Sequence, residues 1–220
     1  MIKIKKNFSI AIDGGSASGK TTGSRLIAKK FNMKLLSSGK LYRYLAYRII
    51  QNKYKYNPIF LRKNSKKINL IKLNNKKLEE NNVTILASQI AKKKYIRLIL
   101  KSFQLDFIKK NKKIIIEGRD IGTKIMPNAD LKIFFKCSLN EKARRRYKEL
   151  KKINQNISLK DVKKSLKIRD FNDKNRKESP LLFVKGAVLV DTTNLSKKQM
   201  EAKLLKLVKL RINKKINGNI

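Results

Sequence analysis

Several residue types that common active sites depend on are missing or rare in this chain of 220 residues. It contains no histidine and a single cysteine, Cys137. These absences exclude Ser-His-Asp and Cys-His catalysis, histidine-ligated metals, cysteine-cluster metal sites and intramolecular disulfides. No apolar run is long enough to cross a membrane, and the one after the basic N-terminal residues is too short for a signal peptide. We therefore expect a cytoplasmic protein with no membrane partner.

Acidic residues are scarce as well. The 15 Asp and Glu residues stand against 57 Lys and Arg, which gives a formal net charge of +42. Such a charge is typical of proteins that bind nucleic acid or anionic membranes. However, the basic residues are 45 Lys and only 12 Arg, and Lys, Ile and Asn together make up 93 residues. All three have AT-rich codons, whereas a binding patch would cluster and use Arg freely. We favour a compositional origin and expect no specific nucleic-acid partner.

Short apolar runs alternate with helical patterns along the chain. The runs at 8–13, 113–117, 131–135 and 187–191 predict buried strands, and Leu35-Leu36 indicates a shorter one. This alternation favours an α/β fold with a parallel sheet flanked by helices. Helices are predicted from Lys20 onward and over 41–50, 83–108, 141–152, 159–175 and 197–212.

Two segments depart from this regular alternation. Residues 51–84 are rich in Lys, Asn and Tyr with weak periodicity, and we interpret them as a small appended region. The closing helix, 197–212, has an apolar stripe and basic residues, so it fits either a membrane-surface helix or a helix packed on the sheet. We favour packing on the sheet because such stripes are common. Residues 213–220 are expected to form a frayed tail.

The first strand leads directly into a glycine- and serine-rich loop. Residues 14–21, GGSASGKT, fit the pattern G-x-x-x-x-G-K-[ST] at every required position. Small residues let backbone N–H groups approach phosphate oxygens, and the following helix adds its positive end. Lys20 can reach the β- and γ-phosphates, and the Thr21 hydroxyl can ligate Mg²⁺. We therefore predict a nucleoside triphosphate site with ATP and Mg²⁺ at these residues: Gly14, Gly15, Ser16, Ala17, Ser18, Gly19, Lys20, Thr21 and Thr22.

Switch GTPases, motor ATPases and small-substrate kinases all share this loop. A guanine-reading N-K-x-D element is not evident, which weakens the GTPase alternative. Three further segments each place Arg beside small or acidic groups at the end of a strand or helix, as a phosphorylated sugar would require. They are 38–43 (SGKLYR), 117–123 (EGRDIGT) and 169–181 (RDFNDKNRKESPL).

Together with the loop, these segments closely resemble bacterial cytidylate kinases from about residue 8 to about residue 210. The resemblance implies transfer of the γ-phosphoryl group of ATP to CMP or dCMP, with Mg²⁺. It also implies a P-loop NTPase-type sheet with a small monophosphate-binding insert and a helical lid. We expect a monomer. The implied parts are a core at 1–38, 106–143 and 177–212, an insert at 39–105 and a lid at 144–176.

The resemblance also carries residue roles over to this sequence. Arg43, Arg119 and Arg176 match the clamp on the monophosphate, and Arg144 belongs to the basic start of the lid. We take Lys20, Arg119, Arg144 and Arg176 as the catalytic set. The resemblance also implies that Ser38 binds substrate. It places Ser88, Arg97 and Asp120 near the cytosine edge, and Arg169 and Asp173 near the ribose.

Some positions depart from the family pattern. Gly15 replaces a proline of the loop, while Ser37 and Glu117 each stand where an aspartate is usual. The region between Arg43 and Ser88 is short, which bears on the choice of monophosphate. A kinase for UMP or AMP and a P-loop NTPase that binds nucleic acid therefore remain as alternatives.

Overall fold

The computed structural model describes residues 7–151 and 156–218 and divides the chain into two compact units. Unit 1 comprises Met1–Leu35 and Lys112–Ile220, and unit 2 comprises Leu36–Asn111. Unit 2 extends a few residues beyond both ends of the insert expected at 39–105. Parts of three sequence-based expectations lie outside the described residues: the N-terminal residues 1–6, residues 152–155 of the lid and its first helix, and residues 219–220 of the tail.

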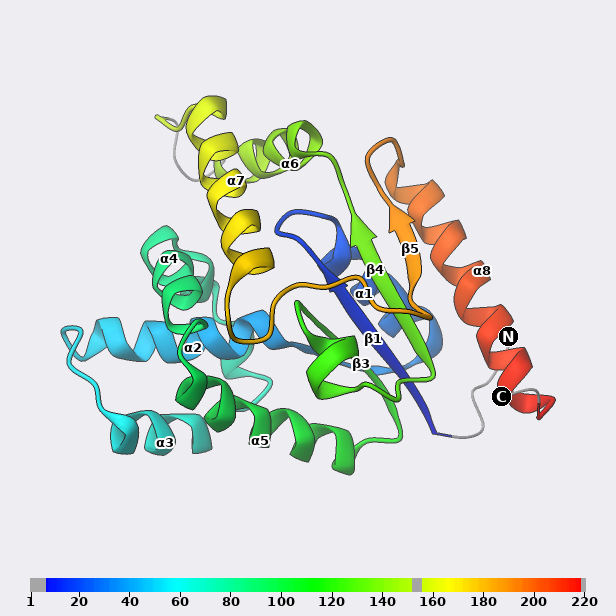
Figure 1. Cartoon of the computed structure of the whole chain (residues 1–220), viewed down its shortest axis with the longest axis horizontal. Coiled ribbons are helices and arrows are strands. Elements are labelled where there is room, and N and C mark those ends of the chain that lie inside the picture. Colours follow the sequence, from blue (N-terminus) through cyan, green and yellow to red (C-terminus); the bar gives the residue numbers. More distant parts are fainter. Residues whose placement is uncertain (1–6, 152–155, 219–220) are drawn as a thin grey trace. The chain divides into compact units, whose positions relative to one another are not determined.

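A five-stranded sheet forms the centre of unit 1 (Figure 1). Its order is β2-β3-β1-β4-β5, and β1 pairs in parallel with both β3 and β4, as β4 does with β5. The register places Asp13 of β1 beside Gly118 of β3, so the loops after both strands leave the sheet at the same edge. The predicted parallel α/β sheet is thus confirmed. The strand bounds are β1 Phe8–Gly14, β2 Lys34–Ser37, β3 Lys113–Gly118, β4 Leu131–Lys136 and β5 Val188–Asp191.

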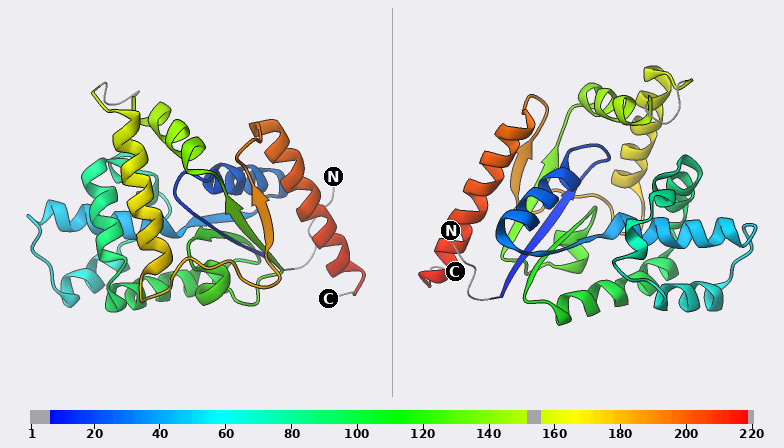
Figure 2. Two further views of the ribbon diagram at one scale, coloured as in Figure 1. Left: turned by 45° about the horizontal axis from the view of Figure 1, so that its top comes forward. Right: turned by 180° about the vertical axis from the view of Figure 1, so that it is seen from behind.

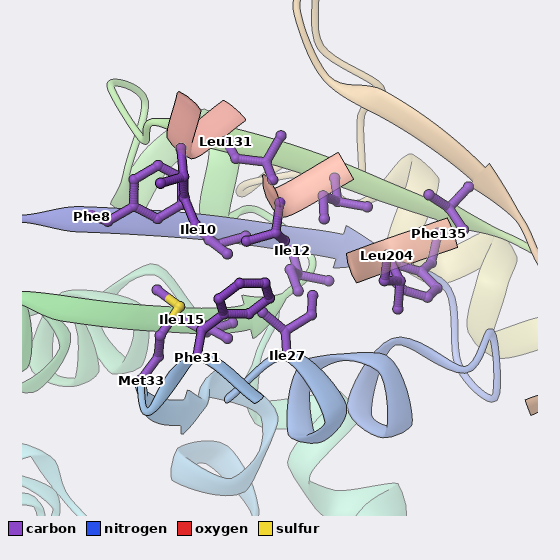
Figure 3. Packing of buried hydrophobic residues seen from close by; sticks show 14 of the residues in the cluster. Phe8, Ile10, Ile12, Ile27, Phe31, Met33, Ile115, Leu131, Phe135 and Leu204 are labelled. Carbon is purple, nitrogen blue, oxygen red and sulfur yellow. The ribbon is translucent and has the colours of Figure 1, made fainter. Parts of the chain in front are cut away.

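Two helices of unit 1, α1 (Lys20–Phe31) and α8 (Lys197–Ile216), pack on the sheet. Ile27 and Phe31 of α1 share a core with Leu204 of α8 and with inward-facing residues of the strands (Figure 3). Met200 of α8 belongs to the same core. Burial of these side chains stabilises the unit, because apolar area removed from water contributes about 25 cal/mol per Å². The apolar stripe of α8 therefore packs on the sheet, as favoured above, and is not available for a membrane surface.

The helix α8 begins at a capping box, in which Ser196 and Gln199 satisfy each other's backbone N–H groups. It ends at Ile216, so the prediction of a frayed tail over 213–220 is wrong for residues 213–216, which are helical. Tertiary contacts extend the helix: Ile212 is buried, and Lys215 pairs with Asp130.

The helices α6 (Leu139–Lys151) and α7 (Leu159–Asn175) lie side by side beyond the end of β4 (Figures 1 and 2). Ala143 of α6 packs against Val162 and Leu166 of α7 in a small core of their own. The bounds of α7 match the prediction, and Ser158 caps its first turn by accepting the Asp161 N–H. The pair covers most of the segment expected to form a lid, 144–176, but α6 begins five residues before that segment.

Unit 2 consists of helices. Their bounds are α2 Ser38–Gln51, α3 Pro58–Lys66, α4 Asn81–Ile90 and α5 Lys94–Lys110, with short 3₁₀ turns η1 Lys72–Asn74 and η2 Lys76–Glu79. The prediction of one helix over 83–108 is wrong, because the chain breaks between α4 and α5. Extended backbone at Lys93 makes the break, and Arg97 Nη1 donates to the Ala91 carbonyl oxygen there at 3.0 Å.

Hydrophobic residues of the weakly periodic segment 51–84 form part of the interior of unit 2. Leu61, Leu73 and Leu78 are buried although they come from three different short elements. Asn57 caps α3, and Pro58 occupies its first turn, where a missing N–H costs nothing. Within the described part of the chain, no helix is long and apolar enough to cross a membrane.

Candidate active site

The loop between β1 and α1 has the geometry of an anion-binding loop. Gly19 adopts φ +87°, in the left-handed region that glycine allows, and is the N-cap of α1. A Cβ at Gly14 would lie 2.6 Å from the Phe135 carbonyl oxygen, so only glycine fits against the end of β4. The strand, loop and helix that the sequence motif requires are therefore present in order.

Lys20, the lysine of the loop motif, is buried, with only 7% of its surface exposed. Its ammonium donates to the Gly15 carbonyl oxygen at 3.0 Å and lies 3.9 Å from Glu117 Oε2. Burial and, next, the charge of Arg119 lower its pKa from 10.5 to about 7, although Glu117 acts in the opposite direction. The ammonium is therefore held inside the loop and lacks full compensation for its charge.

Thr21 and Glu117 bring two oxygen groups together at the start of α1. The Thr21 hydroxyl donates to Glu117 Oε1 at 3.0 Å. Mg²⁺ prefers oxygen ligands and usually combines one or two protein groups with phosphate oxygens and waters. A hydroxyl and a carboxylate at one point fit this ion, so Glu117 in place of aspartate keeps the required donor chemistry.

Asp13, at the end of β1, fixes the segment that follows β3. Its two carboxylate oxygens accept the backbone N–H groups of Ile121 at 2.8 Å and Gly122 at 2.7 Å. Burial raises its pKa to about 6, more than these hydrogen bonds lower it. The segment includes a π-helical turn, Ile121–Ile125, and follows directly on Arg119 and the buried Asp120. Asp13 thus positions two of the predicted site residues.

Arg119 and Arg176 meet at one carboxylate, that of Asp173 on α7. Arg119 Nε donates to Asp173 Oδ2 at 2.6 Å, and Arg176 Nη1 lies 3.4 Å from Asp173 Oδ1. Burial alone would raise the pKa of Asp173, but the charges of Arg119 and Arg176 hold it below its usual value. Arg176 Nε is also oriented by the Ser179 carbonyl oxygen at 2.7 Å.

The charge of this arginine cluster extends to the phosphate loop. Arg119 and, more weakly, Arg169 both lower the pKa of Lys20, and Arg169 also acts on Asp173. The structure therefore brings Lys20, Arg119, Arg169, Asp173 and Arg176 together in one electrostatic site of unit 1.

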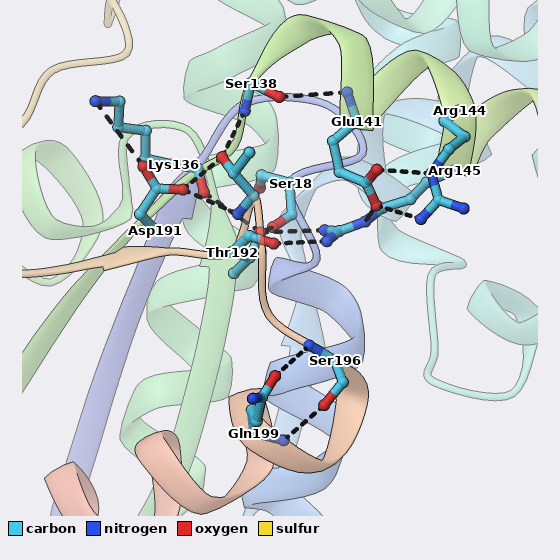
Figure 4. Close-up of polar contacts among 11 residues, drawn as sticks. Ser18, Lys136, Ser138, Glu141, Arg144, Arg145, Asp191, Thr192, Ser196 and Gln199 are labelled. Atoms are coloured by element: carbon cyan, nitrogen blue, oxygen red, sulfur yellow. Dashed lines mark hydrogen bonds and ion pairs between the residues drawn. The ribbon is translucent and has the colours of Figure 1, made fainter.

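Three basic residues near the start of α6 differ in where they point. The Arg144 side chain is 55% exposed and pairs with Glu141 (Figure 4). Arg145 turns inward and donates to the Thr192 hydroxyl at 3.1 Å and the Thr192 carbonyl oxygen at 2.6 Å. Thr192 in turn donates to the Ser18 carbonyl oxygen of the loop at 2.8 Å. Lys142 is nearly buried and pairs with Asp170.

Four predicted substrate residues lie in unit 2. Ser38 is buried at the start of α2, and Ser88 is half-buried on α4. Arg43 forms an ion pair with Glu79, and the Arg97 guanidinium lies 5.6 Å from the centre of the Tyr42 ring. A carboxylate and an aromatic face thus hold the two arginines within this unit.

Five residues of the site did not emerge from the sequence: Asp13, Lys142, Arg145, Asp170 and Thr192. Asp13 carried a usable signal, because it ends the strand before the loop. Asp170 and Arg145 lie inside segments that were recognised, beside residues that were chosen. Nothing in the sequence distinguished Lys142 from the other lysines, because the chain contains 45 of them.

Comparison with known proteins agrees with this geometry. Residues 10–210 match the family described as cytidylate kinase. The chain is 38% identical over 210 residues to a cytidylate kinase of Rickettsia rickettsii, with 95% of each chain covered. It is 39% identical to one of Fusobacterium nucleatum over 201 residues, which cover 86% of this chain and 92% of that protein.

Solved structures support the fold. A gluconokinase from Sinorhizobium meliloti 1021 aligns with a TM-score of 0.52 at 15% identity, covering 96% of this chain and 97% of that one. At this identity the likeness concerns the fold alone. The extent of the family match and the identity to the curated relatives decide the assignment: the chain belongs to the cytidylate kinase family.

Proposed function

We propose that this protein transfers the γ-phosphoryl group of ATP to CMP or dCMP and so releases ADP with CDP or dCDP. The observation that carries the proposal is the electrostatic coupling of the phosphate loop to the arginine cluster on Asp173. Two anionic substrates repel each other, so catalysis of phosphoryl transfer consists largely of neutralising and aligning them. Family membership supports a cytosine nucleotide as the acceptor.

In this proposal, residues 14–22 bind the ATP phosphates. The ammonium of Lys20 exchanges the Gly15 carbonyl oxygen for oxygens of the β- and γ-phosphates. Thr21 and Glu117 are the residues that would hold Mg²⁺. The ion, when bound, neutralises charge on the phosphates and helps to align them. The ion pair with Glu117, at 3.9 Å, also helps to hold the Lys20 ammonium in place.

Arg119 and Arg176 bind the phosphate of CMP and neutralise charge that develops on the transferred group. Asp173 keeps the two guanidinium groups close together despite their repulsion, and Asp13 fixes the segment that follows Arg119. Arg43 is the third arginine of this proposed clamp, and Ser38 is a further substrate-binding residue. The residues we propose for the cytosine of CMP are Ser88, Arg97 and Asp120, and those for its ribose are Arg169 and Asp173. Arg43 would then exchange Glu79 for a substrate oxygen.

The exposed Arg144 remains a proposed catalytic residue of a lid at 144–176, where its pair with Glu141 must open to reach a phosphate. We propose that unit 2 binds the nucleoside monophosphate and that the enzyme acts as a monomer. ATP and CMP are cytoplasmic metabolites, which supports a cytoplasmic role in pyrimidine nucleotide metabolism.

A coupled ADP-release assay with a panel of monophosphates tests the proposal. We expect Mg²⁺-dependent turnover with CMP, acceptance of dCMP, and poor turnover with AMP. Equal rates with AMP and CMP, or no rate with CMP, would refute the assignment. Addition of DNA or RNA in place of CMP should not stimulate ATP turnover.

A further inference from the structure

We propose that Asp170 of α7 is a latch that occupies a phosphate position of the loop in the nucleotide-free protein, and that Lys142 of α6 is released to contact the ATP phosphates when the latch opens. This inference rests on the proposed function, because it assigns the loop to ATP. It adds one residue that competes with the nucleotide and one that binds it.

The first observation is a carboxylate bound to the phosphate loop. The Ser16 backbone N–H donates to Asp170 Oδ1 at 3.3 Å. Backbone N–H groups of such a loop form a concave anion site, so a carboxylate oxygen there stands where a phosphate oxygen would bind. Asp170 comes from a helix far along the chain and satisfies a donor that the nucleotide would otherwise satisfy.

The second observation is a cation that faces the same point. Lys142 is nearly buried, with 9% of its surface exposed, although lysine is almost always exposed unless it is paired. Its ammonium donates to Asp170 Oδ2 at 2.6 Å. The two oxygens of Asp170 therefore join the loop to α6, and the carboxylate compensates the charge of Lys142.

The backbone of the loop leaves room for this arrangement. An added Cβ at Gly15 would lie 2.9 Å from Asp170 Oδ1 and 3.0 Å from the Lys142 ammonium. The first distance is shorter than a real Cβ contact and the second is tight, so a side chain at residue 15 would require Asp170 and Lys142 to shift. Asp170 and Lys142 thus contact the surface of the loop itself.

A triphosphate that enters the loop cannot share this position with a carboxylate. Binding must therefore displace Asp170 from Ser16, and the like charges of Asp170 and the phosphates oppose any partial sharing. Lys142 then loses its partner at the place where phosphate oxygens arrive. A buried ammonium without a partner is unfavourable. When a phosphate takes the place of the Asp170 carboxylate, the positive charge of Lys142 still has a negatively charged partner.

The test is the affinity of the full chain for inorganic tripolyphosphate, measured by calorimetry, with Asp170→Asn and Asp170→Ala. Each variant removes the competing charge and frees Lys142, so each should bind roughly tenfold more tightly, the worth of one charge-assisted hydrogen bond. Lys142→Met should bind roughly tenfold more weakly. In the Lys142→Met background, Asp170→Asn should give a smaller gain. Asp106→Asn, on an exposed position of α5, is the matched control and should change nothing.

Unchanged or weaker affinity in both folded Asp170 variants, at thermal stability matched to wild type, would overturn the latch. If Asp170→Asn raised the affinity for tripolyphosphate equally in the wild-type and Lys142→Met backgrounds, the proposed contact of Lys142 with phosphate would be wrong. Turnover of CMP by the wild type is measured in parallel. The expected order of affinities without CMP turnover would refute the proposed function alone, and CMP turnover without that order would refute the latch alone.

Discussion

The buried ammonium of Lys20 makes nucleotide binding sensitive to pH above neutrality. Burial, the charge of Arg119 and the partial compensation by Glu117 set its pKa at about 7 in the free protein. A bound triphosphate supplies several negative charges at this ammonium, so its pKa returns toward the ordinary value of 10.5. Binding above pH 7 must therefore include uptake of a proton by Lys20.

The size of the effect follows from the pKa. One pH unit above a pKa of about 7, roughly one-tenth of the Lys20 side chains are charged before binding, and two units above it roughly one-hundredth. The affinity for a triphosphate should then fall about tenfold for each unit between pH 7.5 and 9, or about 1.4 kcal/mol per unit. The second ionisation of a terminal phosphate lies near pH 6, so it is complete over this range.

Isothermal titration calorimetry with a non-hydrolysable ATP analogue measures both the affinity and the proton uptake. Buffers with different heats of ionisation should reveal uptake that approaches one proton at pH 9. Lys20→Met should bind weakly at every pH and without this uptake. Lys30→Met, on an exposed position of the same helix, should keep both the slope and the uptake of the wild type.

Two results would refute the reasoning. A wild-type affinity that is flat from pH 7.5 to 9, without proton uptake, would mean that Lys20 is already charged in the free protein. A slope that persists in Lys20→Met would assign the titration to another group.

The other predictions concern rate, recognition and stability. Lys20→Ala should lower kcat by about 10³, as several kcal/mol of transition-state stabilisation are lost, and near-normal turnover in a folded variant would contradict this. Arg119→Lys should lower kcat/KM for CMP by roughly 10- to 100-fold, because an ammonium on a flexible stem lacks the planar fork that fixes the directions of the guanidinium's hydrogen bonds. Arg25→Lys, exposed on α1, is its control, and equal effects would contradict the assignment. The pKa of Asp13 is raised from 3.8 to about 6, so the native state binds more protons within that window. The free energy of unfolding, measured with urea relative to Asp13→Asn, should therefore fall as pH rises through it, and a rise would contradict the assignment.

The sequence predicted those parts of the fold that depend on local signals. The β-branched run at 113–118 and the glycines around the loop define a strand and a turn without tertiary context. Ser158 marks the start of α7 because it caps the first turn. The break between α4 and α5 had no comparable signal, since neither Gly nor Pro stands at 91–93. The extra turn of α8 likewise depends on contacts with residues far away in the sequence.

For the arginine cluster, the sequence indicated which residues to examine but not which partners they contact. Resemblance selected Arg119 from one segment, and Asp173 and Arg176 from another that lies more than 50 residues later. The structure shows that both arginines contact the Asp173 carboxylate. Nothing in the sequence indicated which oxygen each guanidinium would use. Asp170 follows the selected Arg169 and Lys142 lies two residues before the selected Arg144, but their pairing depends on how α6 and α7 pack together.

The arrangement of acidic residues explains how a chain with a net charge of +42 builds a selective phosphate site. Only 15 acidic residues are present, and five of them belong to the site of unit 1: Asp13, Glu117, Asp120, Asp170 and Asp173. Five cations act among them: Lys20, Arg119, Lys142, Arg169 and Arg176. Before nucleotides bind, the site is therefore close to neutral when its side chains carry their ordinary charges, despite its basic surroundings. In the proposed mechanism, Asp173 holds Arg119 and Arg176 in fixed directions while they bind phosphate, and a phosphate replaces Asp170 at the loop and at Lys142. We infer that selection depends on this fixed arrangement of donors, because the lysines distributed over the surface attract anions without regard to their geometry.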